Sequence, residues 1–168
     1  MTPQPMTSPK RRAGVDEPIT ITVPMPPNLA NGRGHSRWIS AAKKRYFAML
    51  DNRQNCGLIP RPPEHAIERV VITSIAYVGM PNDSENMKFR AYKWPVDWLR
   101  TRGYIVNDNP AHCTMVQPSQ VVKRGQVYRV ELTLTPSGDT HDAVAEYRKA
   151  VIASVAPPSL NQGKANGL

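Results

Sequence analysis

The alternation of apolar and polar residues predicts a sheet of four strands. Residues 19–23 alternate isoleucine or valine with threonine, which places the apolar side chains on one face of an extended chain. Residues 67–78 are rich in the β-branched side chains that favour strands. Near the other end of the chain, residues 116–122 and 127–135 predict a closing hairpin around the short turn between them.

Apolar residues at helical spacing predict three helices. Ser40 is a suitable N-cap for the first helix, which should end near residue 55. Residues 87–102 have helical composition, and Pro95 either kinks one helix or begins a second one. The glycine after residue 102 suits a helix C-cap. Residues 139–155 predict a last, amphipathic helix. The apolar stripes of the first and last helices are Ala42, Tyr46, Met49 and Leu50, and Ala143, Val144, Tyr147, Val151 and Val155.

Strands and helices follow one another in the order strand, helix, strand, helix, strand, strand, helix. This order predicts a single small α+β domain, in which helices pack on a mixed sheet. A length of 168 residues is typical of one domain. Residues 1–18 are rich in proline, serine and basic side chains and predict a disordered basic tail, and residues 156–168 predict a second disordered tail. The folded domain should therefore span residues 19–155.

The charge of the chain indicates a polyanionic partner. Lysine and arginine number 22 against 13 aspartate and glutamate residues, a formal net charge of +9, and DNA is the commonest polyanion. Residues 28–50 contain five basic side chains and no acid. Trp38, beside this charge, could stack on unpaired bases. The alternative is a solvated basic surface that only aids solubility. The five basic residues are Arg33, Arg37, Lys43, Lys44 and Arg45.

The location expected for the protein is the cytoplasm. No apolar stretch is long enough to cross a bilayer, and the N-terminal residues lack the apolar core of a secretory signal. Cys56 and Cys113 are far apart and predict two free thiols. His112 lies next to Cys113, but no second pair stands at zinc-finger spacing. We expect neither a membrane partner nor a small-molecule cofactor.

Three acidic residues predict a metal site. Asp83 and Glu85 follow the predicted strand 67–78, and in extended geometry both side chains would point to the same side. Two such carboxylates repel unless a cation lies between them, and their oxygens suit Mg²⁺ or Mn²⁺. Asp108 follows the second helix, which could return it to the same place. The metal would activate a water for phosphodiester hydrolysis, and Lys88 or Lys93 would stabilise the charge that develops on phosphate.

The same acids have a structural interpretation. Asp83 is a suitable N-cap, with Glu85 and Asn86 in the first turn of the following helix. Residues 108–110, Asp-Asn-Pro, have the composition of a turn. The sequence leaves both interpretations open.

Several segments together resemble the RusA family of Holliday junction resolvases, which are endodeoxyribonucleases of phages and prophages. The resemblance covers about residues 19–136. Residues 19–28 resemble the family's opening strand and its Pro-Pro-Ser/Asn turn, and residues 31–50 resemble its DNA-facing segment. Residues 83–86, Asp-Ser-Glu-Asn, take the place of its Asp-x-Asp-Asn motif. Its Gly-aromatic-x-x-Asp-Asp stretch and last strand are similar to residues 103–108 and 129–134.

This resemblance implies a RusA-like fold and a homodimer that nicks four-way junctions in pairs, in DNA recombination and repair. It implies dependence on Mg²⁺, with Mn²⁺ as a substitute, and the cytoplasm of the host cell if a phage encodes the protein. The catalytic, metal-binding carboxylates would be Asp83, Glu85 and Asp108. The functional lysine is Lys93 if the helix end is aligned, or lies near Lys88 if the acidic motif is aligned. The two alignments differ because this chain has about one extra helical turn.

Two departures from the family pattern lead to a second hypothesis. Glu85 replaces an aspartate and is longer by a methylene, and Asn107 replaces the first acid of the Asp-Asp pair. The first hypothesis is a junction-cutting nuclease. The second is a catalytically weak or inactive protein that binds branched DNA with the same fold, and a third is a basic phage structural protein. The expected DNA contacts are Arg33, Arg37, Trp38, Lys43, Lys44, Arg45 and Lys88.

Overall fold

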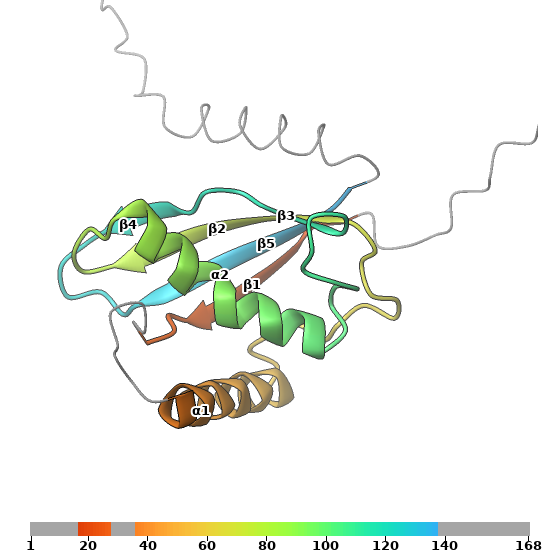
Figure 1. The fold of residues 1–168 in the computed structure, drawn as a ribbon, viewed down its shortest axis with the longest axis horizontal. Coiled ribbons are helices and arrows are strands. Elements are labelled where there is room, and N and C mark those ends of the chain that lie inside the picture. The colour runs from red at the N-terminus through yellow and green to blue at the C-terminus, as the bar shows by residue number, and fades with distance from the viewer. Residues whose placement is uncertain (1–16, 28–35, 138–168) are drawn as a thin grey trace, which may run out of the picture.

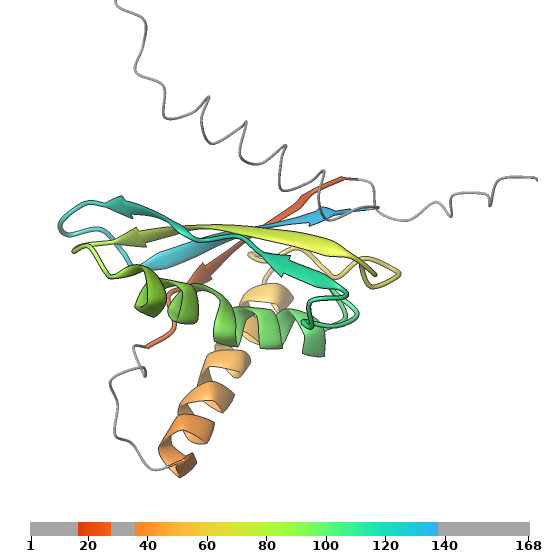
Figure 2. The ribbon, with the colours of Figure 1, turned by 45° about the horizontal axis from the view of Figure 1, so that its top comes forward.

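The computed structural model describes residues 17–27 and 36–137, and its centre is a five-stranded mixed sheet (Figure 1). Two helices of the described chain lie against one face of this sheet (Figure 2). The predicted small α+β domain, with helices packed on a mixed sheet, is confirmed. The elements are β1 (Ile19–Pro24), α1 (Ser36–Asn55), β2 (Val70–Val78), α2 (Ser84–Thr101), β3 (Cys113–Met115), β4 (Ser119–Val122) and β5 (Arg129–Pro136).

β2 is the central strand of the sheet because it pairs with three other strands. It runs antiparallel to β5 on one side and parallel to both β3 and β4 on the other. β5 also pairs antiparallel with β1, which forms one edge. The opposite edge is divided between β3 and β4, which residues 116–118 separate. The strand order is therefore β1-β5-β2, followed by β3 and β4, which lie end to end along the same side of β2.

The predicted hairpin of residues 116–122 and 127–135 is wrong, because β2 lies between the two strands. The turn has suitable chemistry, since its glycine has a φ of +79°. The connection nevertheless crosses the end of β2. The backbone N–H of Lys123 donates to the Val78 oxygen at 2.9 Å, and the Gln126 side chain donates to the same oxygen at 2.6 Å. These long-range bonds hold β4 and β5 on opposite sides of β2.

The core lies between the sheet and the helices. In β1, Ile21 and Val23 are buried between less buried threonines, as the alternating pattern predicts. β5 alternates in the same way. The strand predicted for residues 67–78 is shorter in the structure, because β2 begins at Val70. Ile67 forms only an isolated bridge with Ile105. Residues 70–74 of β2 are all buried.

α1 begins earlier than predicted. It starts at Ser36, so Ser40 lies inside the helix and is not its N-cap, and the helix ends at Asn55 as expected. Tyr46 and Leu50 are buried and Ala42 packs against the core, but Met49 is 38% exposed. Ile39 and Phe47 pack against the core as well. The apolar face of α1 is therefore rotated slightly from the predicted stripe.

α2 is one helix that contains Pro95, so this proline does not begin a second helix. It starts at Ser84, before residue 87, because the Asp83 side chain accepts a hydrogen bond from the Asn86 N–H at 2.9 Å. It ends as predicted at a glycine. Gly103 has a φ of +78°, and its N–H donates to the Arg100 oxygen at 3.2 Å. The next N–H, of Tyr104, donates to the Leu99 oxygen at 3.0 Å, which completes a Schellman motif.

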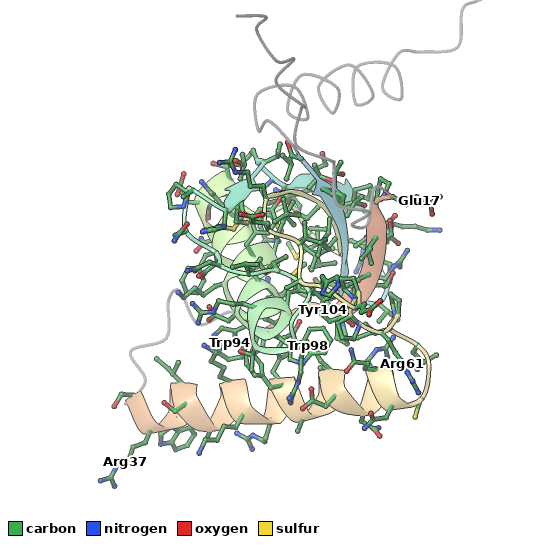
Figure 3. The ribbon with its side chains drawn as sticks, turned by 90° about the vertical axis from the view of Figure 1, so that its right-hand side faces the viewer. Glu17, Arg37, Arg61, Trp94, Trp98 and Tyr104 are labelled. Carbon is green, nitrogen blue, oxygen red and sulfur yellow. The ribbon has the colours of Figure 1, made fainter. Side chains whose placement is uncertain are left out.

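The aromatic residues of α2 connect it to α1 and the sheet. Figure 3 shows Trp94 and Trp98 on the side of α2 that faces α1. Trp94 lies 5.7 Å from Tyr46, and Trp98 lies 5.5 Å from Tyr104, measured between ring centroids. The Tyr46 hydroxyl donates to the Pro24 oxygen at 2.9 Å and so connects α1 to the end of β1.

Three predicted segments lie outside the described residues. These segments are most of the tail 1–18, the amphipathic helix 139–155 and the tail 156–168. Within the described ranges, none of the helices has the length and hydropathy that crossing a membrane requires.

Candidate DNA-binding and catalytic site

Asp83 and Glu85 do not continue the geometry of β2. Asp83 is the exposed N-cap of α2 and has an extended backbone, with φ −64° and ψ 158°. One carboxylate oxygen accepts from the Asn86 N–H at 2.9 Å, and the other accepts from the Asn86 side-chain amide. These hydrogen bonds hold the pKa of Asp83 below its ordinary value. Glu85 belongs to the first turn of the helix. The structural interpretation of this motif is therefore confirmed.

Asp108 lies beside the C-terminal half of α2. The chain after Gly103 runs parallel to the residues before β2, because the Ile67 N–H donates to Tyr104 and the Val106 N–H donates back to Ile67, at 2.9 and 3.1 Å. Asp108 then accepts a hydrogen bond from Arg100 at 2.9 Å, in an ion pair. The loop after α2 thus stays on the side of the sheet that carries the helices.

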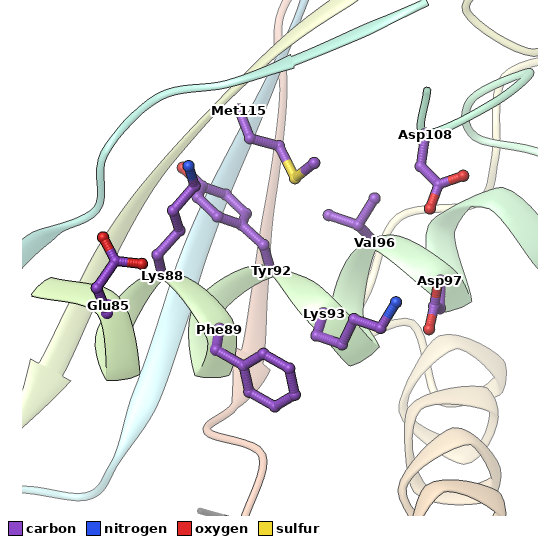
Figure 4. Close-up of a pocket in the computed structure, with 9 residues that line it drawn as sticks. All are labelled: Glu85, Lys88, Phe89, Tyr92, Lys93, Val96, Asp97, Asp108 and Met115. Carbon is purple, nitrogen blue, oxygen red and sulfur yellow. The ribbon is translucent and has the colours of Figure 1, made fainter. Parts of the chain in front are cut away.

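A hollow of about 320 Å³ lies along α2 and collects several of the predicted site residues. Figure 4 shows Glu85 and Lys88 at one end of this α2 hollow, and Asp97 and Asp108 at the other. Lys93 lies between them. Asp83 is not among the lining residues. The full lining is Glu85, Lys88, Phe89, Tyr92, Lys93, Val96, Asp97, Asp108 and Met115.

The three predicted metal ligands do not gather in this structure. Glu85 and Asp97 are 12 positions apart on one helix (97 − 85), which corresponds to about 18 Å along the axis at 1.5 Å per residue. Asp108 lies at the Asp97 end, and Asp83 caps the helix outside the hollow. Among residues 17–27 and 36–137, no group of three His, Cys, Asp or Glu side chains could hold a metal ion. The acids therefore do not form the expected Mg²⁺ or Mn²⁺ site.

Cations of the protein itself neutralise the acids at one end of the hollow. Asp97 pairs with Lys43 of α1 at 2.6 Å, and its side chain is only 10% exposed. Asp108 pairs with Arg100 at 2.9 Å. Within the described part of the chain, Lys88 and Lys93 have no ion-pair partner. The hollow therefore presents two unpaired ammonium groups, which suit a phosphate group.

The exposed face of α1 carries the predicted DNA contacts. Arg37, Lys44 and Arg45 are exposed, and no acid lies in the first turn of the helix. Figure 3 shows Arg37 pointing away from the domain. Trp38 is 76% exposed, which leaves its ring accessible for stacking. Trp94 and Trp98, by contrast, are buried in the core.

Lys43, another of the predicted DNA contacts, is not part of this exposed face. Lys43 points inward, pairs with Asp97 and lies 5.4 Å from the Phe47 ring, so its ammonium group already has partners. The structure therefore gives Lys43 a role between the helices. Arg33 lies outside the described residues.

Sequence reasoning missed Asp97, which is the acid most deeply buried in the hollow. It lies within the run Trp-Pro-Val-Asp-Trp-Leu, and an acid among apolar residues of a helix indicates a buried carboxylate that needs a partner. The partner, Lys43, is 54 positions away and cannot be found from local spacing.

His112 and Cys113, behind Asp108, take part in the packing of the loop and the core. The His112 ring nitrogen Nδ1 lies 2.8 Å from the backbone oxygen of Glu68, so this residue closes the loop before β3. Burial, and to a smaller extent the charge of Asp108, raise the pKa of the Cys113 thiol to about 11. The thiol therefore stays protonated at neutral pH, as expected for a cysteine that packs in the core.

The fold and the hollow define a small basic α+β domain with a cleft of mixed charge beside its second helix. Comparisons with protein-family models and with curated proteins found no match to this chain. The resemblance to the RusA family therefore rests on the motifs and their order alone.

Proposed function

We propose that this protein is a structure-selective endodeoxyribonuclease of the RusA kind, which binds four-way DNA junctions and nicks them. The observation that carries this proposal is the return of Asp108 to the hollow that Glu85 and Lys93 also line. Three positions to which the resemblance assigns catalytic roles thus contribute to one surface, although a whole helix separates two of them in sequence. If the loop after α2 had lain on the other face of the sheet, no shared site would have been possible.

DNA binding would use the exposed cations of α1. Arg37, Lys44 and Arg45 can contact phosphates, and such contacts give an affinity that falls steeply with salt. Trp38 can stack on bases that a junction leaves unpaired. A homodimer with a twofold axis would match the symmetry of a four-way junction and present two hollows. Such a protein would act in the cytoplasm, in the host cell if a phage encodes it.

At the hollow, the lysines would handle the phosphate. Lys93, between the two acidic ends, can donate hydrogen bonds to a phosphate oxygen and stabilise charge that develops on it. Lys88 can hold the same or the neighbouring phosphate. The described residues do not form a metal site as they stand, so Mg²⁺ dependence stays a prediction from the resemblance.

A second function is favoured by a specific observation. Two of the three acids in the hollow, Asp97 and Asp108, already pair with Lys43 and Arg100. Glu85 lies about 18 Å from Asp97 along the helix, so one site cannot use both. A protein that binds branched DNA without cutting it would have these properties. It would keep the basic face of α1 and use the hollow only as a phosphate site.

The test is incubation of the full chain with a labelled four-way junction and Mg²⁺ or Mn²⁺. The variants are Asp108→Asn, Lys93→Ala and, as a matched control, Lys123→Ala, which removes an exposed lysine that does not line the hollow. The nuclease proposal expects nicking by the parent and the control, and none by Asp108→Asn. Tight junction binding without nicks under either metal supports the binding protein. Equal affinity for a junction and a linear duplex contradicts both functions.

A further inference from the structure

An exposed aromatic ring lies among the lysines of the α2 hollow. Phe89 lines the hollow, is 45% exposed, and lies next to Lys88 and one helical turn before Lys93. Figure 4 shows its ring projecting from α2, between these two lysines along the helix. We infer that Phe89 is a stacking platform for an unpaired DNA base, and that the two lysines hold the phosphates next to that base.

The other aromatic rings of α2 that contact rings already have partners. Trp94 packs against Tyr46 and Trp98 packs against Tyr104, with ring centroids 5.7 and 5.5 Å apart. Among the described residues, neither another ring nor a cation lies over Phe89 in this way. An apolar surface stabilises a fold only to the extent that it is removed from water. The exposed face of Phe89 is therefore available to a ligand that brings a planar ring of its own.

The surroundings of Phe89 fit a nucleotide in size and in chemistry. Val96 and Met115 give the hollow an apolar wall beside which a base can lie. Its volume of about 320 Å³ is close to the lower limit of about 300 Å³ for small-ligand sites, which suits one nucleotide and not a duplex. Lys88 and Lys93 have no ion-pair partner among the described residues, so their charge is available to phosphate.

Stacking on Phe89 requires a base with an uncovered face. In a continuous duplex each base has neighbours above and below it, whereas a base in a single strand or at a branch point leaves the stack at lower cost. The base would therefore give the hollow its preference for unpaired DNA, because the phosphates that the lysines contact are common to all DNA. This role rests on the proposed function in one respect, since DNA must be the polymer that reaches the hollow.

Binding of short single strands to the full chain, without a divalent metal, tests this role. Fluorescence anisotropy would be measured with two labelled strands of equal length. One carries normal bases, and the other carries abasic sites throughout and so keeps only the phosphates and sugars. The variants are Phe89→Ala, Phe89→Tyr, Lys93→Ala and Tyr128→Ala. Tyr128 is a matched control, because it is also aromatic, is 43% exposed and does not line the hollow.

Phe89→Ala should bind the strand with bases about tenfold more weakly than the parent, since one stacked base contributes about this much, and should bind the abasic strand like the parent. Phe89→Tyr keeps the ring and should bind both strands like the parent. Lys93→Ala should weaken both strands by the same factor, because it removes a phosphate contact. Tyr128→Ala should leave both affinities unchanged. An equal loss in Phe89→Ala on the two strands, no loss on either, or an equal loss in Tyr128→Ala would overturn the inference.

The measurement involves neither a metal ion nor cleavage, so failure to cut a junction leaves its result unaffected. A junction nuclease whose Phe89→Ala variant binds both strands like the parent would keep the proposed function and exclude this role. Conversely, base-dependent binding through Phe89 without nicks would support the role in a protein that does not cut. Thermal melting by circular dichroism confirms that each variant is folded. If Phe89→Ala does not fold, Phe89→Leu replaces it as an apolar side chain without a ring.

Discussion

The two ends of the α2 hollow contain the same kinds of side chain in different electrostatic settings. At the N-terminal end, Glu85 and Lys88 are exposed, and neither has an ion pair among the described residues. At the other end, Asp97 and Asp108 each pair with a cation from a helix. An acidic residue at a site therefore does not by itself indicate a metal ligand. Its neighbours decide whether it is available for binding or already part of the structure.

The largest expected effect is on catalysis, and it tests whether the middle of the hollow is a reaction site. Lys93→Ala should lower the rate of junction cleavage by about 100-fold, because a positioned donor that stabilises a transition state contributes this much. Its affinity for the junction should change by only a few-fold, since the cations of α1 remain. The measurement is single-turnover cleavage, with Lys123→Ala as the control. A similar loss in both variants would indicate general phosphate binding.

The next largest expected effect is on stability, and it tests whether the acids at the two ends of the hollow differ in their contribution to folding. Asp97→Ala should lower the free energy of unfolding by about 1–3 kcal/mol, because Lys43 would lose its partner and a buried site would be left incompletely filled. Glu85→Gln, in the exposed first turn, should change it by less than about 0.5 kcal/mol. Urea denaturation of both variants provides the comparison. If the two values are equal, the pairing of Asp97 does not distinguish the ends.

A third prediction concerns two adjacent lysines of α1. Lys44→Ala should weaken DNA binding and reduce the salt dependence of the affinity by about one phosphate contact, because Lys44 is exposed. Lys43→Met should leave that salt dependence unchanged and lower the melting temperature, since Lys43 pairs with Asp97. Binding titrations at several salt concentrations distinguish them. The reverse result would show that Lys43 leaves Asp97 to contact phosphate.

The smallest effect is a pH dependence at the N-terminal end. The hydrogen bonds from Asn86 lower the pKa of Asp83 in the folded state, so its ionised form stabilises α2 above the unfolded-state value of 3.8. This contribution is lost as the pH falls through the lower, folded-state pKa. Asp83→Asn keeps a capping side chain without the charge. The parent should therefore be more stable than Asp83→Asn at neutral pH, and the difference should shrink in acid, as melting curves between pH 7 and 2 would test.

The pattern of the sequence predicted the elements better than their pairing. The alternation in residues 19–23 and the end of α2 at Gly103 depend on local geometry, and both were predicted correctly. The hairpin was wrong because two hydrogen bonds from its connection to Val78 depend on a strand more than 40 positions earlier. The residues of the turn alone could not exclude a connection that places β2 between β4 and β5.

The candidate site was predicted in part, for similar reasons. The sequence identified Glu85, Lys88, Lys93 and Asp108, which line one hollow. It could not reveal that Lys43 and Arg100 occupy the acids at one end, because one of these pairs spans 54 positions.

The divided edge of the sheet limits how two copies of this domain could meet. β3 has three residues and β4 has four, and Pro118 between them has no backbone N–H to donate. Such short, interrupted strands are poor templates for the addition of another chain. β1, with six residues, is the longer uninterrupted border among the described strands. A dimer that extends the sheet would therefore join at β1, and a dimer on the β3–β4 side would need side-chain contacts instead of a backbone ladder.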